Sequence, residues 1–100
     1  MFYATWQPAA DIHYSGKQWL IKLELAGVSP AEVQLVAQGN ELTVRGRRRD
    51  LLLQSGFTCH ALEITYTRFE RRIALPATID SASIACEYRD GILRIYLRTL

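Results

Sequence analysis

Hydrophobic and polar residues alternate with a period of two along most of this chain. The clearest run is residues 18–25, where apolar side chains occupy every second position and Lys22 and Glu24 lie between them. Such alternation is typical of a β-strand that buries one face. The apolar face of this run consists of Trp19, Ile21, Leu23 and Leu25. The same pattern predicts further strands within residues 33–37, 42–47, 69–75, 84–88 and 93–97.

Turn signals separate these runs. Gly39-Asn40 is a tight-turn dipeptide between two alternating segments, so residues 33–47 are predicted to form a hairpin. Asp-Gly at residues 90–91 turns the chain again, and residues 29–32 have the capping-box spacing of one helical turn. No longer helical stripe is visible. Short strands with turns every 8–12 residues or so predict an all-β fold, an immunoglobulin-like antiparallel β-sandwich.

Length and composition fit one globular domain. The chain has 100 residues, of which 49% are hydrophobic and 22% charged. No apolar run approaches the ~20 residues of a membrane span, and the first residues lack the features of a secretory signal. Two cysteines are too few for a disulfide framework, so we expect a cytoplasmic protein without a membrane partner. The net charge of +2 does not demand a polyanionic partner.

Catalytic and metal-binding interpretations find little support in the sequence. Cys59 and His60 are adjacent, so on an extended strand their side chains would point to opposite faces and could not form a nucleophile–base pair. These two residues, with His13 and Cys86, could supply four zinc ligands by count, but they lack the short spacings of structural zinc sites. The glycines build no phosphate-binding loop. We therefore expect no enzyme activity, no cofactor and no metal.

The one basic cluster is the run from Arg45 to Arg49, with Gly46 inside it. It could contact phosphate groups, and a nucleic-acid binder is one alternative that it leaves open. No aromatic residues are interleaved with the cluster, and Asp50 follows it directly. A solvated strand face, with arginine stems covering apolar surface, is the favoured interpretation, and we expect no nucleic-acid partner.

Arg71 lies on the apolar phase of its strand. The alternation places it on the same face as Phe69 and Ile73, whereas Arg72 falls on the other face. A core-facing arginine is costly unless it is paired and hydrogen-bonded, and its guanidinium suits a carboxylate across an interface. The alternative is a position at the margin of the sheet, from which the side chain reaches water.

Four sequence elements carry a family resemblance. Residues 69–76 have the form F-x-R-x-[apolar]-x-L-P, and residues 85–93 end on D-G-I-L. Upstream, residues 25–28 read L-A-G-V and residues 42–46 read L-T-V-R-G. In their order along the chain, and with a spacing that fits residues 8–98, the four elements resemble the α-crystallin domain of the small heat shock proteins, the Hsp20 family.

The resemblance implies an ATP-independent holdase, a chaperone that binds partly unfolded proteins and prevents their aggregation. In the family, a groove between two edge strands accepts the C-terminal I/V-x-I/V motif, and here we expect it to be free for client segments. The matching strands here give the candidate groove residues Leu35, Ala37, Ile84 and Cys86. The CS domain of p23-like cochaperones, a docking module for a folded partner, shares the sandwich and is the alternative.

The connection at residues 49–63 also follows from the resemblance. In bacterial and plant small heat shock proteins it projects as a loop and pairs with the neighbouring subunit, whereas CS domains keep it short. Its apolar residues would form an unusual exposed patch in an isolated subunit. We therefore expect a homodimer whose interface contains Leu51, Leu52, Leu53, Phe57 and Arg71.

The expected domain organisation is a short N-terminal segment at residues 1–7 and the α-crystallin domain at residues 8–100. Members of the resembled family build large oligomers with a longer N-terminal arm and a C-terminal I/V-x-I/V tail. Seven residues precede Pro8 here, and the sequence stops at Leu100, directly after the last predicted strand. The sequence therefore predicts a dimer rather than a shell of many subunits.

Overall fold

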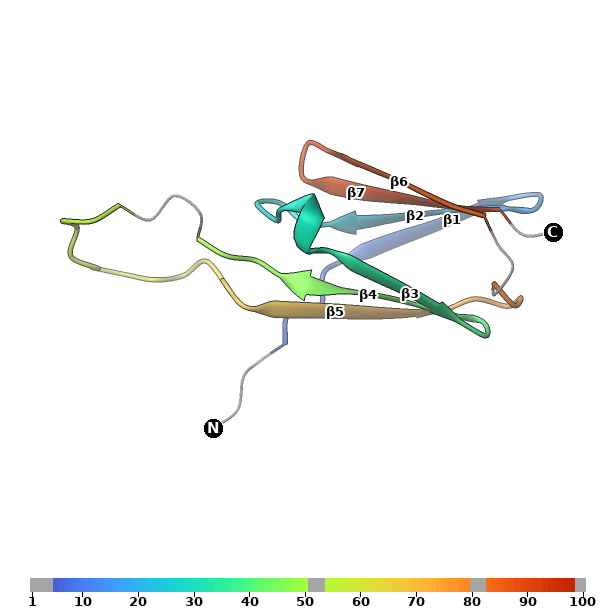
Figure 1. Ribbon diagram of the computed structural model, residues 1–100, viewed down its shortest axis with the longest axis horizontal. Helices are drawn as coiled ribbons and strands as arrows, with labels where there is room; N and C mark the ends of the chain where they lie inside the picture. The colour runs from blue at the N-terminus through green and yellow to red at the C-terminus, as the bar shows by residue number, and fades with distance from the viewer. Residues whose placement is uncertain (1–4, 51–53, 80–82, 99–100) are drawn as a thin grey trace.

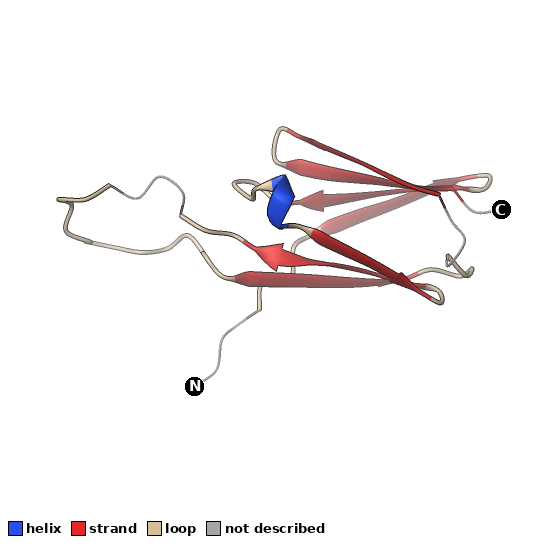
Figure 2. Ribbon diagram, viewed as in Figure 1, coloured by secondary structure: helices blue, strands red, loops and turns tan. Residues whose placement is uncertain are grey.

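The fold is a sandwich of two antiparallel β-sheets, as the alternation predicts (Figures 1 and 2). A computed structural model describes residues 5–50, 54–79 and 83–98 of the chain. Within these ranges one sheet has the strand order β1-β2-β7-β6 and the other has the order β3-β4-β5. The strands are β1 (Ala10–Ser15), β2 (Gln18–Glu24), β3 (Gln34–Gln38), β4 (Glu41–Arg47), β5 (Arg68–Ala74), β6 (Ser83–Arg89) and β7 (Ile92–Arg98).

The core lies between the two sheets. Residues opposite each other in an antiparallel pair share a face, so the pairing of Ile21 with Ile95 and of Leu42 with Ile73 gathers apolar side chains on the two inner faces. Further residues from the turns close the ends of the layer. The buried hydrophobic residues are Ile21, Leu23, Leu25, Val28, Leu42, Val44, Phe69, Ile73, Leu75, Ile79, Leu93, Ile95 and Leu97.

Strand β1 was not among the strands predicted from the sequence. It pairs with β2 through six residues, and Gly16, with φ +60°, makes the turn between the two strands. Ile12 and Tyr14 lie on the inward phase of β1 but are exposed, because the strand forms an edge of its sheet. Tyr14 stacks on Trp19, with 4.9 Å between the ring centroids. The period-two signal is present in this segment, with Ala10, Ile12 and Tyr14 alternating with three polar residues.

The N-terminal segment covers one edge of the three-stranded sheet. Trp6 N donates to Arg68 O (3.0 Å), Trp6 O accepts from Glu70 N (3.1 Å), and the Trp6 ring meets Phe69 edge-on. The chain then enters β1 a few residues later (Figure 1). Strands β5 and β1 therefore flank one side of the sandwich. The two other terminal strands, β3 and β6, flank the opposite side.

The helical turn predicted at residues 29–32 is present as a 3₁₀ turn, η1 (Pro30–Glu32), with Ser29 at its N-cap. The side-chain hydrogen bond of a capping box is not made. The Glu32 carboxylate instead accepts a bifurcated hydrogen bond from Arg49 Nε, at 2.9 Å to Oε1 and 3.1 Å to Oε2. A charge-assisted contact to a distant arginine has replaced the local one. No helix among the described residues is long and apolar enough to cross a membrane.

The connection between β4 and β5 extends away from the sandwich (Figure 1). Its residues 54–66 are all exposed. At its base, Arg48 Nε donates to Thr65 O (2.8 Å) and Arg48 Nη1 donates to Ala26 O (3.3 Å). The Arg48 guanidinium also lies over the Trp6 ring, 4.0 Å from its centroid. One side chain thus joins the base of the projecting connection, the N-terminal segment and the turn after β2.

Gly46 is required by close packing. A Cβ at this position would lie 2.5 Å from Glu32 O and 2.7 Å from Phe69 Cζ. The backbone oxygen cannot easily move, so we expect Gly46→Ala to lower the free energy of unfolding by about 3 kcal/mol. Gly16→Ala is the control: it places a Cβ in open space at φ +60° and should cost about 1 kcal/mol. Urea unfolding measures both, and equal losses would show that the contact at Gly46 is not limiting.

Candidate functional site

The groove residues predicted on β3 lie on the inner face of the three-stranded sheet. Leu35 pairs with Val44 and Ala37 pairs with Leu42, and both partners belong to the core. Leu35 and Ala37 are themselves only partly buried, although they pack against the core. Strand β3 is the end strand of its sheet, so its inner face has one open flank. The side chains are therefore apolar, inward and accessible from the edge.

Strand β6 carries the other two predicted groove residues. Ile84 pairs with Leu97 and Cys86 pairs with Ile95, which places both on the inner face of the four-stranded sheet. Ile84 is nevertheless 41% exposed, and Cys86 is exposed as well. Strand β6 is anchored toward its C-terminal end, where Tyr88 Oη donates to Leu25 O (2.8 Å) and the ring packs against the core. The strand is thus fixed at Tyr88 and open toward Ile84.

These two strands share a property of their backbones. Each is the last strand of its sheet, so one side of each carries backbone N–H and C=O groups that no neighbouring strand takes up. Both lie on the side of the sandwich opposite the N-terminal segment. We name the pair the open edge: β3 and β6 with the inward side chains Leu35, Ala37, Ile84 and Cys86. An extended apolar segment is the ligand that such an edge can take, by added strand pairing and side-chain burial.

The two cysteines lie in different surroundings, and the structure does not bring them together with the histidines. Partial burial on the open edge raises the pKa of the Cys86 thiol above its usual value, which favours the neutral form. Cys59 and His60 lie exposed on the projecting connection, outside any strand. In the ranges 5–50, 54–79 and 83–98, no group of three or more His, Cys, Asp or Glu side chains could hold a metal ion.

Arg71 pairs with Val44 and is half-buried on the inward side of β5. Within the part of the chain that the structure describes, its guanidinium has no hydrogen bond or ion pair. Arg72 points the other way, is exposed, and lies 3.7 Å from Glu70. The two neighbouring arginines therefore differ in burial as the alternation predicts. Among the described residues Arg71 has no carboxylate partner, and its place on the terminal strand β5 also fits the alternative of a sheet margin.

The projecting connection displays apolar side chains. The predicted interface residue Phe57 is 79% exposed, and Leu51, Leu52 and Leu53 lie outside the described residues. Sequence reasoning missed three further exposed residues, Leu62, Ile64 and Tyr66. The signal was available, because these residues alternate at every second position before β5 begins.

Comparisons with known proteins agree with this architecture. The family model described as Hsp20/alpha crystallin family matches residues 11–100. Small heat shock protein C4 of Rickettsia felis is 30% identical over 88 residues, which cover 88% of this chain and 54% of that protein. Small heat shock protein C2 of the same organism is 27% identical, with 88% and 57% covered. The chain thus spans about half the length of the curated relatives that it matches.

Solved structures show the same fold. Heat shock protein 16.0 from Schizosaccharomyces pombe superposes with a TM-score of 0.83 at 25% identity, covering 95% of this chain and 88% of that one. The hspA protein from Xanthomonas axonopodis has a TM-score of 0.76 at 28% identity, with 96% of both chains covered. The family model covers residues 11–100 and the solved structures superpose on the same sandwich, so the chain belongs to the Hsp20/alpha crystallin family of small heat shock proteins.

Proposed function

We propose that this chain is an ATP-independent holdase that binds extended apolar segments of partly unfolded proteins at the open edge. One observation carries the proposal: four apolar side chains have the strand register of core residues, yet they are accessible to solvent. Leu35, Ala37, Ile84 and Cys86 sit at core-facing positions but remain accessible. Ordinary surface strands direct such positions into a covered core. Apolar surface left uncovered on the flank of a sheet is suited to a transient apolar ligand.

The backbone of the open edge supports the same proposal. A partly unfolded client exposes apolar side chains together with unpaired backbone groups. An added strand satisfies the backbone groups of β3 or β6, and its alternate side chains can reach the inward apolar positions. Neither step depends on a particular client sequence, since main-chain hydrogen bonds are common to all peptides.

A homodimer is the second part of the proposal. Phe57, Leu62 and Ile64 extend into water on the projecting connection, and Ile12 and Tyr14 lie uncovered on the edge strand β1. The projecting connection offers an apolar segment and β1 offers an open strand edge, so the connection of one subunit can pair with β1 of the other. Arg48 anchors the base of the connection and so limits the directions in which it can project. Arg71 would find its carboxylate partner across this interface.

A reducing compartment fits the state of the cysteines. Cys59 and Cys86 are both free thiols. Exposed free thiols persist where glutathione and thioredoxin keep them reduced, so we retain a cytoplasmic location as a prediction.

Aggregation of a heated model substrate without ATP tests the holdase proposal. The wild-type chain should suppress light scattering at a several-fold molar excess. Ile84→Asp places a charge on the open edge and should remove most of the protection, because a buried carboxylate opposes binding of an apolar segment. Ala85→Asp is the matched control, since Ala85 lies on the same strand and faces outward. Equal protection by both variants would contradict the assignment of the site. A wild-type chain without protection would favour a docking module for a folded partner.

Light scattering tests the dimer. At high micromolar concentration the wild-type chain should have twice the monomer mass of 11.4 kDa. Phe57→Ser and Arg71→Ala should each raise the dimer dissociation constant by about tenfold or more, through lost apolar burial and a carboxylate left unpaired. Arg72→Ala, on the outward face, should leave the constant unchanged. A monomeric wild type, or equal effects of the two arginine variants, would rule out this interface.

A further inference from the structure

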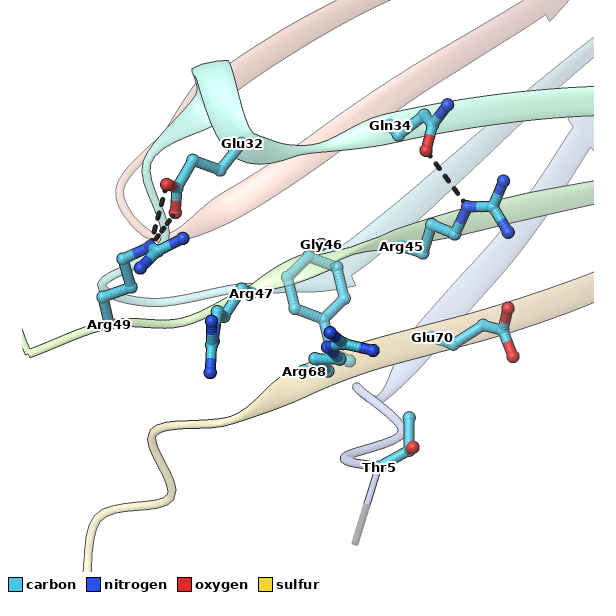
Figure 3. A pocket seen from close by; sticks show the side chains of 10 residues that line it. Thr5, Glu32, Gln34, Arg45, Gly46, Arg47, Arg49, Arg68 and Glu70 are labelled. Carbon is cyan, nitrogen blue, oxygen red and sulfur yellow. Dashed lines mark hydrogen bonds and ion pairs between the residues drawn. The ribbon is translucent and has the colours of Figure 1, made fainter. Parts of the chain in front are cut away.

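A basic cavity lies on the outer face of the three-stranded sheet, near the base of the projecting connection (Figure 3). Its volume is about 660 Å³. Gly46 and Phe69 form part of its wall, and four arginines from β4, β5 and the segment after β4 surround it. The charged side chains that line it are Glu32, Arg45, Arg47, Arg49, Arg68 and Glu70.

Two of the four arginines are already held by neighbours. Arg45 Nε donates to Gln34 Oε1 (3.1 Å), and Arg49 Nε donates to the Glu32 carboxylate. These contacts fix both side chains at the rim of the cavity, as the dashed lines in Figure 3 show. The rim is therefore partly ordered before any ligand arrives, which lowers the entropy that binding must overcome.

The other two arginines lie directly opposite each other and have no partner among the described residues. Arg47 and Arg68 are directly opposite in the pairing of β4 with β5, so both side chains stand on the outer face. Like charges at directly opposed positions destabilise a strand pair. Among the described residues neither guanidinium has a hydrogen bond or ion pair. The pair thus carries an electrostatic cost that a bound anion would remove.

We propose that Arg47 and Arg68 form a binding site for a single oxyanion group, a carboxylate or a phosphate monoester. The planar guanidinium donates two parallel hydrogen bonds to such a group, and two guanidinium groups can hold it from both sides. The ligand is one group rather than a polyanion, for two reasons. Glu32 and Glu70 lie at the same cavity and repel extended negative charge. Arg48, in the middle of the basic run, is turned to Ala26 and Trp6 and does not extend the patch.

This site is separate from the open edge. The open edge uses inward positions of β3 and β6, whereas the cavity uses outward positions of β4 and β5. A variant that removes anion binding should therefore leave the aggregation assay unchanged when no anion is added.

Two titrations test the proposal and distinguish the sources of the anion. The two probes are inorganic phosphate and a short capped peptide that contains one glutamate. The same peptide with glutamine in place of glutamate is the control. Chloride holds the ionic strength constant. In NMR spectra, the Nε–Hε chemical shifts of Arg47 and Arg68 should change with probe concentration and reach a plateau. Saturation by phosphate alone assigns a free phosphate group, and saturation by the glutamate peptide alone assigns a protein carboxylate. No saturable shift with either probe overturns the site, as does tighter binding of a long oligonucleotide than of both probes.

Arg47→Gln and Arg68→Gln provide a readout that does not depend on the probe. Each removes the like-charge pair, so each should raise the melting temperature slightly in anion-free buffer while weakening anion binding by about tenfold. Arg72→Gln, an outward arginine of β5 that does not line the cavity, should change neither. Binding that survives both substitutions, or is lost equally in Arg72→Gln, contradicts the assignment.

Discussion

The structure depends on one constraint: its two sheets pack face to face but never close into a barrel. Four strands are therefore terminal, and each exposes a row of backbone groups on one side. The N-terminal segment covers part of β5 through Trp6. The edges of β1, β3 and β6 have no such cover within the described residues. The proposed activities follow from these edges, with a partner subunit at β1 and a client at β3 and β6.

Packing at Gly46 and Arg48 holds the edges in place. Phe69 and the Glu32 carbonyl close over Gly46, which brings the turn before β3 against the C-terminal end of β4. Two residues later, Arg48 ties the projecting connection to Ala26 and Trp6. The projecting connection and the turn before β3 are thus held at their bases by short, specific contacts.

The sequence was sufficient for most of the fold, because burial in a sandwich has the same period as the side chains of a strand. The runs around Ile21, Leu42 and Ile95 were predicted as strands and form the centre of the core. Strand β1 was missed because its apolar phase is weak: Ala10 is small and Tyr14 is amphipathic, which leaves Ile12 as its one aliphatic residue of any size. The alternation also indicated which side of a strand each residue occupies, including the half-buried position of Arg71.

The alternation of hydrophobic and polar residues does not predict contacts between distant segments of the chain. Nothing in the sequence showed that Arg48 leaves the basic run to contact Trp6, or that Glu32 would bind Arg49 rather than cap its own turn. The cavity between Arg47 and Arg68 likewise requires the register of β4 with β5. Such features arise from tertiary packing, where residues far apart in sequence compete for the same side chain.

Hydrogen exchange with a bound client tests the central claim most directly. The account predicts that a destabilised client protein slows exchange at the amides of β3 (residues 34–38) and β6 (residues 83–89) that point away from their sheets. Exchange in the central strands β2 and β7 should be unchanged, since their backbone groups are already paired. A client that binds without any added protection at β3 or β6 would contradict the claim that the open edge holds it.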